Sequence, residues 1–341
     1  MIRPLLTLAL LLIAPAAQAL ECGGTRLFQA LERDDPALAA SIRAEADSIA
    51  NGDGLVWRVT DPRRPDRAPL TLFGTMHMSD PRLLDLPAPA RTAFDGAQRL
   101  VLEVTEILDP ARLAALGFRL ASRMSYTDGT TLDARLPADA IGEVKAAAQA
   151  AGLPWSVAGR MKPWALMGQI ALPACERARK AAGRPFLDIA LGRQAQARGL
   201  DVRALETMEG QMSVLDALPE EAMVQGLVET VRLGARIEDV FETMIALYDE
   251  ERIGLVWTIL NHYGPKGFLD PAEAARERSG GYAEFQRLVV DERNVAMAGG
   301  VEAVMDDRAT FVAVGALHLP GETGLVRLLR ARGYTVERLT D

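Results

Sequence analysis

The chain has 341 residues, of which 49% are hydrophobic and 25% charged, and its formal net charge is −8. This composition is typical of a folded globular protein with a large core. The basic residues are scattered, so the chain lacks the clustered positive field that binds phosphates, which argues against a nucleic-acid partner.

Residues 1–19 have the pattern of a secretory signal peptide. Arg3 gives a positive start, residues 5–13 form an apolar core, and residues 17–19 (Ala-Gln-Ala) form a small-x-small cleavage site. The apolar core is short for a membrane-spanning helix, although an uncleaved anchor is the alternative. We therefore expect cleavage after Ala19 and a periplasmic or secreted mature chain without a further membrane span.

The sequence contains two cysteines, Cys22 and Cys175. An exported protein with an even number of cysteines is expected to pair them, and two separate thiols are the alternative. We predict an intramolecular disulfide that ties the mature N-terminus to the middle of the chain. Cysteine-based zinc binding is not indicated, because the sequence has no C-x-x-C motif.

In the first half of the chain, short apolar runs alternate with helical patterns. The order is a helical lead-in at 20–52, two strands at 54–61 and 70–77, a helix at 88–97, a strand at 99–106, and helices at 110–125 and 136–151. A Pro-rich turn separates the first two strands, so they are predicted to form a hairpin.

The second half is mostly helical until its final strands. It begins with short helices or loops and a helix at 185–200, continues with a strand at 201–206 and helices over 208–263, and then has a loop at 259–271 and a helix at 281–305. A strand at 309–318, a helix at 321–332 and a strand at 333–339 follow. We predict an α/β fold with a central mixed β-sheet, helices on it and a large helical middle region, roughly 107–290, as a cap. Residues 20–341 are expected to form a single domain.

Four ionisable side chains stand at or just after the ends of predicted strands. His77 and His318 follow apolar runs that end in glycine, whereas Glu103 and Glu206 lie at the ends of "RLVLEV" and "DVRALE". Ligand sites of α/β sheets form beyond the carboxyl ends of the strands. If the four strands are neighbours, two imidazoles and two carboxylates meet there and suit a divalent metal.

Gly74 and Gly315 each precede a histidine by three residues. A glycine at this position is expected to let the chain turn where a side chain would block metal or substrate. The third histidine, His262, is expected to be an exposed loop or cap residue.

The motifs "LFGTMH", "LVLEV", "FLDIALGRQAQARGLDVRALETMEGQ", "DERNVAMA" and "FVAVGALHLPGETGLVRLLRARGYTVERL" occur in this order. They resemble the TraB/PrgY/GumN family, to which the Tiki metalloproteases belong, from about residue 53 to 339. The resemblance implies an α/β fold related to erythromycin-esterase and haem-binding ChaN-like proteins. It also implies a divalent-metal site, but it does not carry over a substrate.

Mapped onto this chain, the family motifs imply His77, Glu103, Glu206 and His318 as metal ligands, with manganese, cobalt or zinc as the ion. One of the two glutamates would act as general base, and the choice between them stays open. Arg293 would pair with a site carboxylate or bind a carboxylate of the substrate, and an Arg that only orders its helix is the alternative. Two residues flank the Glu206 motif: Asp188, expected to turn inward, and Gln211, expected to donate to the site.

These observations favour a metal-dependent hydrolase, expected to be a peptidase that acts on peptides or proteins. The ion would acidify a water molecule and polarise the scissile carbonyl. Two alternatives remain: a non-catalytic protein of the same fold that binds a peptide or haem, and a metal-independent esterase-like hydrolase that uses His77 as a base. The sequence does not give the oligomeric state.

Overall fold

The computed structural model describes residues 22–277 and 281–340. Its centre is a mixed six-stranded sheet with the strand order β4-β3-β7-β2-β1-β8. The strands are β1 (Val56–Thr60), β2 (Leu70–Thr75), β3 (Arg99–Leu102), β4 (Asp201–Ala204), β7 (Thr310–Gly315) and β8 (Thr335–Arg338). Strands β4, β3, β7 and β2 are parallel, and β1 runs antiparallel to both β2 and β8. The predicted α/β fold with a mixed sheet and the predicted hairpin are confirmed.

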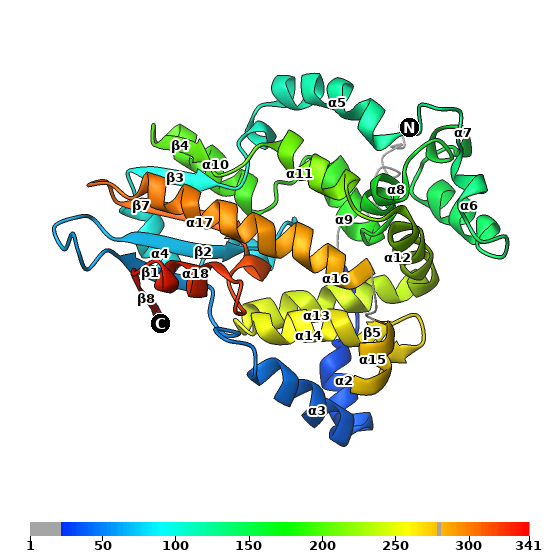
Figure 1. Ribbon diagram of the computed structural model, residues 1–341, viewed down its shortest axis with the longest axis horizontal. Coiled ribbons are helices and arrows are strands. Elements are labelled where there is room, and N and C mark those ends of the chain that lie inside the picture. Colours follow the sequence, from blue (N-terminus) through cyan, green and yellow to red (C-terminus); the bar gives the residue numbers. More distant parts are fainter. Residues whose placement is uncertain (1–21, 278–280, 341) are drawn as a thin grey trace, which may run out of the picture.

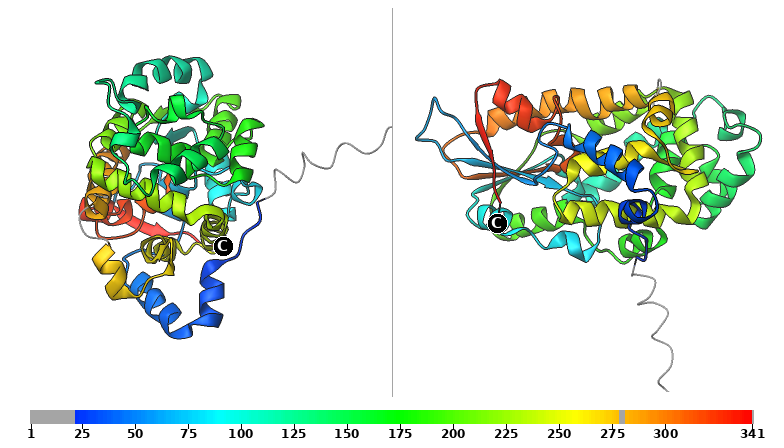
Figure 2. Two further views of the ribbon diagram at one scale, coloured as in Figure 1. Left: turned by 90° about the vertical axis from the view of Figure 1, so that its right-hand side faces the viewer. Right: turned by 90° about the horizontal axis from the view of Figure 1, so that it is seen from below.

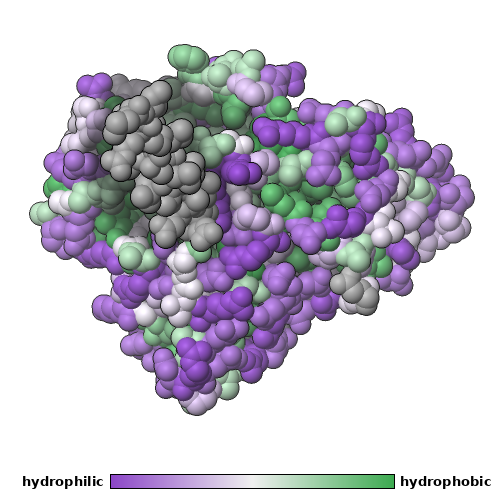
Figure 3. All heavy atoms as spheres, turned by 180° about the vertical axis from the view of Figure 1, so that it is seen from behind, coloured by the Kyte–Doolittle hydropathy of each residue, from purple (hydrophilic) through white to green (hydrophobic). Residues whose placement is uncertain are grey.

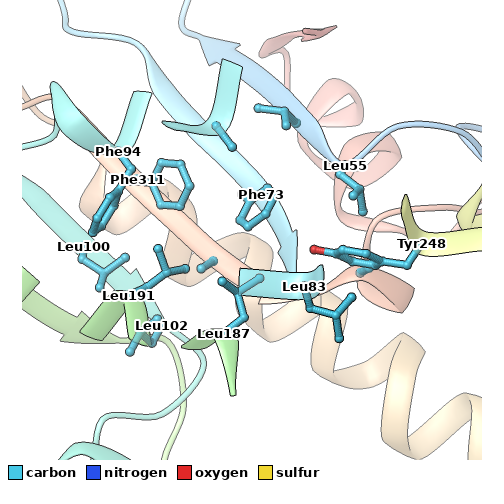
Figure 4. Close-up of a cluster of buried hydrophobic side chains, with 14 of the residues drawn as sticks. Leu55, Phe73, Leu83, Phe94, Leu100, Leu102, Leu187, Leu191, Tyr248 and Phe311 are labelled. Carbon is cyan, nitrogen blue, oxygen red and sulfur yellow. The ribbon is translucent and has the colours of Figure 1, made fainter. Parts of the chain in front are cut away.

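Helices cover both faces of the sheet (Figure 1). One face packs against α17 (Arg293–Val304) and α18 (Leu325–Ala331), and the other against α4 (Ala88–Asp95) and α10 (Leu187–Ala197). Successive side chains of β7 alternate between the two cores, since Phe311 faces the α4–α10 side and Val312 the α17–α18 side. Figure 4 shows Phe311 beside Phe73 and Phe94 in the first of these cores. This two-sided burial explains why the central strands read as continuous apolar runs.

Helices from the middle of the chain lie at the other end of the molecule from the sheet (Figures 1 and 2). They are α5 (Pro110–Met124), α6 (Ile141–Ala150), α7 (Trp155–Ala158), α8 (Pro163–Ile170), α9 (Ala174–Ala181), α11 (Met208–Asp216), α12 (Glu220–Leu233), α13 (Ile237–Asp249) and α14 (Ile253–His262). Within this run only β4 joins the sheet, as predicted. These helices have apolar clusters of their own, and two of them, α13 and α14, lie beyond the carboxyl ends of β2 and β7.

The N-terminal part described here packs on the helical region. Helices α2 (Leu27–Asp34) and α3 (Pro36–Asp47) share an apolar cluster with α14. The predicted disulfide between Cys22 and Cys175 is confirmed and joins the start of the described chain to α9. The predicted signal peptide lies outside the described residues.

No helix within residues 22–277 and 281–340 is long and apolar enough to cross a membrane. Hydrophilic side chains cover most of the face shown in Figure 3.

Several element boundaries differ from the prediction. The helix expected at 281–305 consists of α16 (Gly281–Phe285), a π-helical segment η5 (Gln286–Glu292) and α17. The loop expected at 259–271 contains the end of α14 and two short paired strands, β5 (Tyr263–Gly264) and β6 (Gly267–Phe268), before α15 (Pro271–Glu277). Short 3-10 turns account for other irregular stretches: η1 (Pro81–Leu84), η2 (Glu106–Leu108), η3 (Leu132–Ala134), η4 (Gly234–Arg236) and η6 (Ala316–His318).

Candidate metal centre and active site

The four predicted site residues come from four adjacent strands. Strands β4, β3, β7 and β2 lie side by side and parallel, so their carboxyl ends meet at one edge of the sheet. Glu206 follows β4, Glu103 follows β3 directly, His318 ends the 3-10 turn after β7, and His77 follows β2. The requirement that these strands be neighbours is therefore met.

Both histidine rings direct their Nε2 atoms to the carboxylate of Glu103. Its Oε1 lies 4.0 Å from Nε2 of His77 and 3.9 Å from Nε2 of His318. The same oxygen accepts a hydrogen bond of 2.6 Å from the backbone N–H of Gly315, the last residue of β7. The side chain is buried, so its carboxylate is fixed between three strands.

The other oxygen of Glu103 is held by two donors. Gln211 donates through Nε2 at 2.9 Å, and Arg293 donates through Nη2 at 2.7 Å. Gln211 also donates to Glu206 at 3.1 Å. The prediction that Gln211 donates to the site is confirmed. These bonds leave Oε1 as the oxygen that faces the imidazoles.

The orientation of the His77 ring follows from its buried partner. Its Nδ1 lies 3.0 Å from Oδ2 of Asp188, a residue of α10 that is only 2% exposed. The other carboxylate oxygen of Asp188 accepts a hydrogen bond of 2.9 Å from the hydroxyl of Thr75. Because a carboxylate can only accept, Nδ1 of His77 is the donor, and Nε2 is directed to Glu103. Asp188 thus turns inward, as predicted.

His318 is oriented in the same way by an amide. Its Nδ1 lies 2.6 Å from Oδ1 of Asn294 on α17. Nδ2 of Asn294 donates to the carbonyl of Thr323, and this bond fixes which end of the amide faces His318. His318 therefore donates through Nδ1 and directs Nε2 to Glu103. Two imidazoles held at Nδ1 by acceptors, with both Nε2 atoms converging, is the arrangement that orients histidine ligands of metals.

The two histidines differ in protonation. Burial lowers the pKa of His77, but the charge and hydrogen bond of Asp188 outweigh this and raise the pKa to about 9. Its side chain is nevertheless 53% exposed, because one side of the ring faces the open pocket. Burial lowers the pKa of His318 to about 4; Glu103 opposes this shift and Arg293 adds to it. At neutral pH, His77 is therefore protonated and His318 is neutral.

Glu103 stays ionised over the whole physiological range. Burial would raise its pKa, but His318, His77 and Arg293, together with the N–H of Gly315, lower it to about 2. His318 contributes a charge only in its protonated form, so His77 and Arg293 are the cations that act at neutral pH. A permanently ionised carboxylate beside two imidazoles is an attractive position for a cation.

Glu206 lies farther from the histidines and is engaged by Arg293. The Nε of Arg293 donates to both oxygens of Glu206, at 3.1 and 3.2 Å, and Nη2 donates to Oε2 at 2.7 Å. Arg293 directly follows the π-helical segment η5 and bridges Glu206 and Glu103. Of the interpretations open for Arg293, pairing with site carboxylates is the one seen. No hydrogen bond or ion pair among the described residues joins Glu206 to either histidine.

The donor set fits a divalent ion, but the donor atoms lie farther apart than the ligand atoms of a single bound ion. Ligand atoms about 2.1 Å from a shared ion lie roughly 3.0–3.4 Å apart, whereas the two His–Glu103 separations are 3.9 and 4.0 Å. Accordingly, no group of three or more His, Cys, Asp or Glu within 22–277 and 281–340 meets the spacing for holding a metal. Once His77 has released its proton, two imidazole nitrogens and one carboxylate oxygen form a suitable ligand set for manganese, cobalt or zinc.

The comparison with known proteins agrees with the motifs. The model of the TraB/PrgY/gumN family matches residues 55–338. The chain belongs to this family. Two relatives from Danio rerio are similar over most of this TraB/PrgY/gumN chain: metalloprotease TIKI2 is 25% identical over 84% of it, and metalloprotease TIKI1 is 24% identical over 79%. The chain spans about three fifths of the length of these relatives, 61% and 60% respectively. No solved structure gave a significant match.

The two glycines of this TraB/PrgY/gumN chain have different roles. A Cβ on Gly315 would lie 3.2 Å from Oε1 of Glu103 and 3.8 Å from Nε2 of His77, so this glycine keeps the centre of the site free, as predicted. A Cβ on Gly74 would instead meet Leu319 at 2.8 Å and Ala316 at 3.0 Å. The predicted role of Gly74 was wrong: it allows β2 to pack closely against the turn after β7.

A pocket of about 330 Å³ opens over the site of this family member. Its polar side chains at the sheet edge are Thr75, His77, Glu103, Arg293 and His318. Gly315 and the apolar residues Met76, Met78, Ala316 and Leu317 lie on the same side, and residues of α13 and α14 face them. Glu206 is not among the lining residues, so its carboxylate stands behind Arg293 and not in the pocket.

The loop that follows His77 is held by α9. Glu176 accepts a hydrogen bond of 2.6 Å from the backbone N–H of Ser79, and Arg179 pairs with Asp80 at 3.0 Å. All four residues are buried. The position of His77 is therefore supported from α10 through Asp188 and from α9 through the next residues of the loop.

One histidine prediction was wrong, and two supporting residues were missed. His262 is fully buried, where Nε2 lies 2.9 Å from Glu45 and Nδ1 lies 3.1 Å from the carbonyl of Leu269. Asn294 was also missed, although it adjoins Arg293 in the motif "DERNVAMA". Tyr248 was missed because nothing in the sequence links α13 to β2; its hydroxyl donates to the carbonyl of Gly74.

Proposed function

We propose that this chain is an exported, metal-dependent hydrolase that acts on peptides or proteins. The observation that carries the proposal is the convergence of Nε2 of His77 and Nε2 of His318 on Oε1 of Glu103, with both Nδ1 atoms held by acceptors. The names of the two Danio rerio relatives, both metalloproteases, support the same chemistry.

His77, His318 and Glu103 would hold the ion, with manganese, cobalt and zinc all compatible with these donors. When bound, such an ion supplies a water molecule of lowered pKa and polarises a carbonyl oxygen. Asp188 and Asn294 keep the two rings oriented, and orienting partners of this kind are typical of histidine ligands.

Of the two glutamates that the sequence left open as ligand or general base, Glu103 is the better candidate for either role. It lines the pocket and faces both imidazoles, whereas Glu206 pairs with Arg293 outside the lining. Arg293 lines the pocket beside them. Its guanidinium would stabilise negative charge that develops on the scissile carbonyl oxygen, and Glu206 would keep it in position.

Export is supported by the disulfide between Cys22 and Cys175, because such bonds persist in oxidising compartments. The pattern of residues 1–19 supports it as well. We accordingly propose a periplasmic or secreted location.

The test compares metal content and peptide hydrolysis in four proteins: the wild type, His318→Ala, Glu103→Ala and the control His262→Ala. His262 is the matched control because it is a buried histidine whose partners lie outside the pocket. We expect the first two variants to lose bound metal and hydrolysis, measured by elemental analysis and digestion of a peptide library. His262→Ala should lower thermal stability while folded protein keeps the metal. A folded His318→Ala protein with full metal-dependent turnover would contradict the proposal.

A metal-independent hydrolase is the second candidate, and the His77–Asp188 pair favours it. A carboxylate at 3.0 Å from Nδ1 orients an imidazole whose Nε2 faces the pocket, as in acid–base catalysis. Hydrolysis that survives exhaustive chelation but is lost in His77→Ala would select this candidate. Peptide binding without hydrolysis under either condition would instead identify a binding protein.

A further inference from the structure

The pocket over the site has one wall that carries its charged side chains and a second wall without them. The first, the polar wall, is the sheet edge described above, where apolar residues (Met76, Met78, Ala316 and Leu317) also line the pocket, and the second wall comes from the helical region. This second wall, the apolar wall, consists of Phe241, Met244 and Tyr248 of α13 and Ile253 and Val256 of α14. Apart from Tyr248, these side chains carry no group that can hydrogen-bond strongly.

The hydroxyl of Tyr248 is already used. It donates to the carbonyl of Gly74 at 2.7 Å, and burial raises its pKa above the ordinary value for tyrosine. Figure 4 shows the ring of Tyr248 among the apolar side chains of the core. Tyr248 therefore presents an apolar ring to the pocket and does not act as a proton donor to a substrate.

The apolar wall is partly preformed and partly adaptable. Ile253 and Val256 are buried, which fixes the rear of the wall, whereas Phe241 and Met244 are only partly buried and border the open space. A methionine thioether adjusts to ligands of different shape. With about 330 Å³, the pocket is at the small end of the usual range for ligand sites, so it suits one large side chain and the adjoining peptide bond.

We infer that the apolar wall is a specificity site that selects a large aliphatic or aromatic side chain next to the scissile bond, an inference that rests on the proposed hydrolase function. A charged side chain placed there would lose its hydration without gaining a partner on α13 or α14, which is costly. The polar wall would receive the peptide bond while the apolar wall holds the neighbouring side chain. The substrate class is thus peptides with an exposed Leu, Ile, Phe or Met at one defined position.

The test uses labelled peptides that differ at one position only, with Leu, Phe, Ala, Lys or Glu. Their dissociation constants are measured by fluorescence anisotropy on the metal-free mature protein, and kcat/KM is measured after metal is added. Compared with the Ala peptide, we expect the Leu and Phe peptides to have dissociation constants at least tenfold lower and kcat/KM values at least tenfold higher, since one methylene in an apolar pocket is worth roughly 10–200-fold. Lys and Glu peptides should be weaker still.

Two variants test whether the side-chain preference arises from the apolar wall. Met244→Ala enlarges the pocket and should shift the preference from Leu to Phe by several-fold. Leu260→Ala is the control, because Leu260 is an exposed residue of α14 outside the pocket, and it should leave the order unchanged. Thermal melting confirms that both variants are folded.

The two proposals fail in different ways. Equal dissociation constants for the Leu, Lys and Glu peptides, or an unchanged order in folded Met244→Ala, would overturn the specificity site. If binding depends on the side chain but no added metal gives hydrolysis, the specificity site is supported and the hydrolase function is rejected.

Discussion

Replacing Gly315 with alanine tests the proposed ligand arrangement at its centre. The added Cβ would lie 3.2 Å from Oε1 of Glu103, 3.5 Å from Cδ2 of His318 and 3.8 Å from Nε2 of His77. The backbone of Gly315, with φ −52° and ψ 132°, is open to alanine without strain. Relief of the 3.2 Å contact needs a shift of only a few tenths of an ångström. We therefore expect the free energy of unfolding to change by less than about 1 kcal/mol.

Metal binding should respond much more strongly, because the methyl group occupies the space that the three ligands share. We expect the affinity to fall on the order of 10–100-fold, as when the surroundings of metal ligands are disturbed, which equals about 1.4–2.8 kcal/mol. Calorimetric titration of chelator-treated protein with Mn²⁺ or Zn²⁺ measures this change, and urea denaturation measures stability.

The matched control is Gly299→Ala on α17, where an added Cβ meets no atom within 4 Å. It should stabilise the helix by roughly 0.5–1 kcal/mol and leave metal affinity unchanged. A folded Gly315→Ala protein with wild-type affinity would refute the reasoning, since the ion could not then be held where Glu103 meets the histidines.

Three further predictions follow, two from the contacts of His77 and one from the disulfide. Asp188→Asn should lower the pKa of His77 from about 9, because burial and Arg293 then act against a weaker opposing partner, and NMR titration of the ring C–H signals measures it; an unchanged pKa would show that Asp188 is not the cause. Metal affinity should fall about tenfold for each pH unit below about 9, since His77 must release its proton to bind the ion. Calorimetric titration in two buffers with different ionisation enthalpies measures the protons released on metal binding. No proton release at pH 7.5 would contradict this prediction. Replacing Cys22 and Cys175 by serine should lower the free energy of unfolding by about 2–5 kcal/mol, and an unchanged urea midpoint under oxidising conditions would be inconsistent with a stabilising bridge.

The sequence predicted those parts of the site that rest on short-range patterns. The strands before His77, Glu103 and His318 are largely apolar runs, whereas β4, before Glu206, contains Asp201 and Arg203. Parallel strands place their carboxyl ends at one edge. The inward turn of Asp188 was also predicted, from its place on the flank of the Glu206 motif.

The features that were missed depend on contacts between distant segments. His262 is buried because α3 brings Glu45 to it across more than two hundred residues, which no local pattern indicates. The role of Gly74 likewise depends on how closely the turn after β7 approaches β2. The π-helical segment η5, directly before Arg293, was also missed, because helical periodicity alone predicts a regular helix there.

The disulfide has a consequence beyond stability. Cys175 belongs to the same short helix, α9, as Glu176 and Arg179, which hold the two residues just beyond the histidine loop of β2. The covalent bond therefore anchors, at its first turn, the helix that braces one half of the site. Where thiols stay reduced, this brace loses its anchor. The redox state of Cys22 and Cys175 is thereby coupled to how firmly the loop after His77 is held.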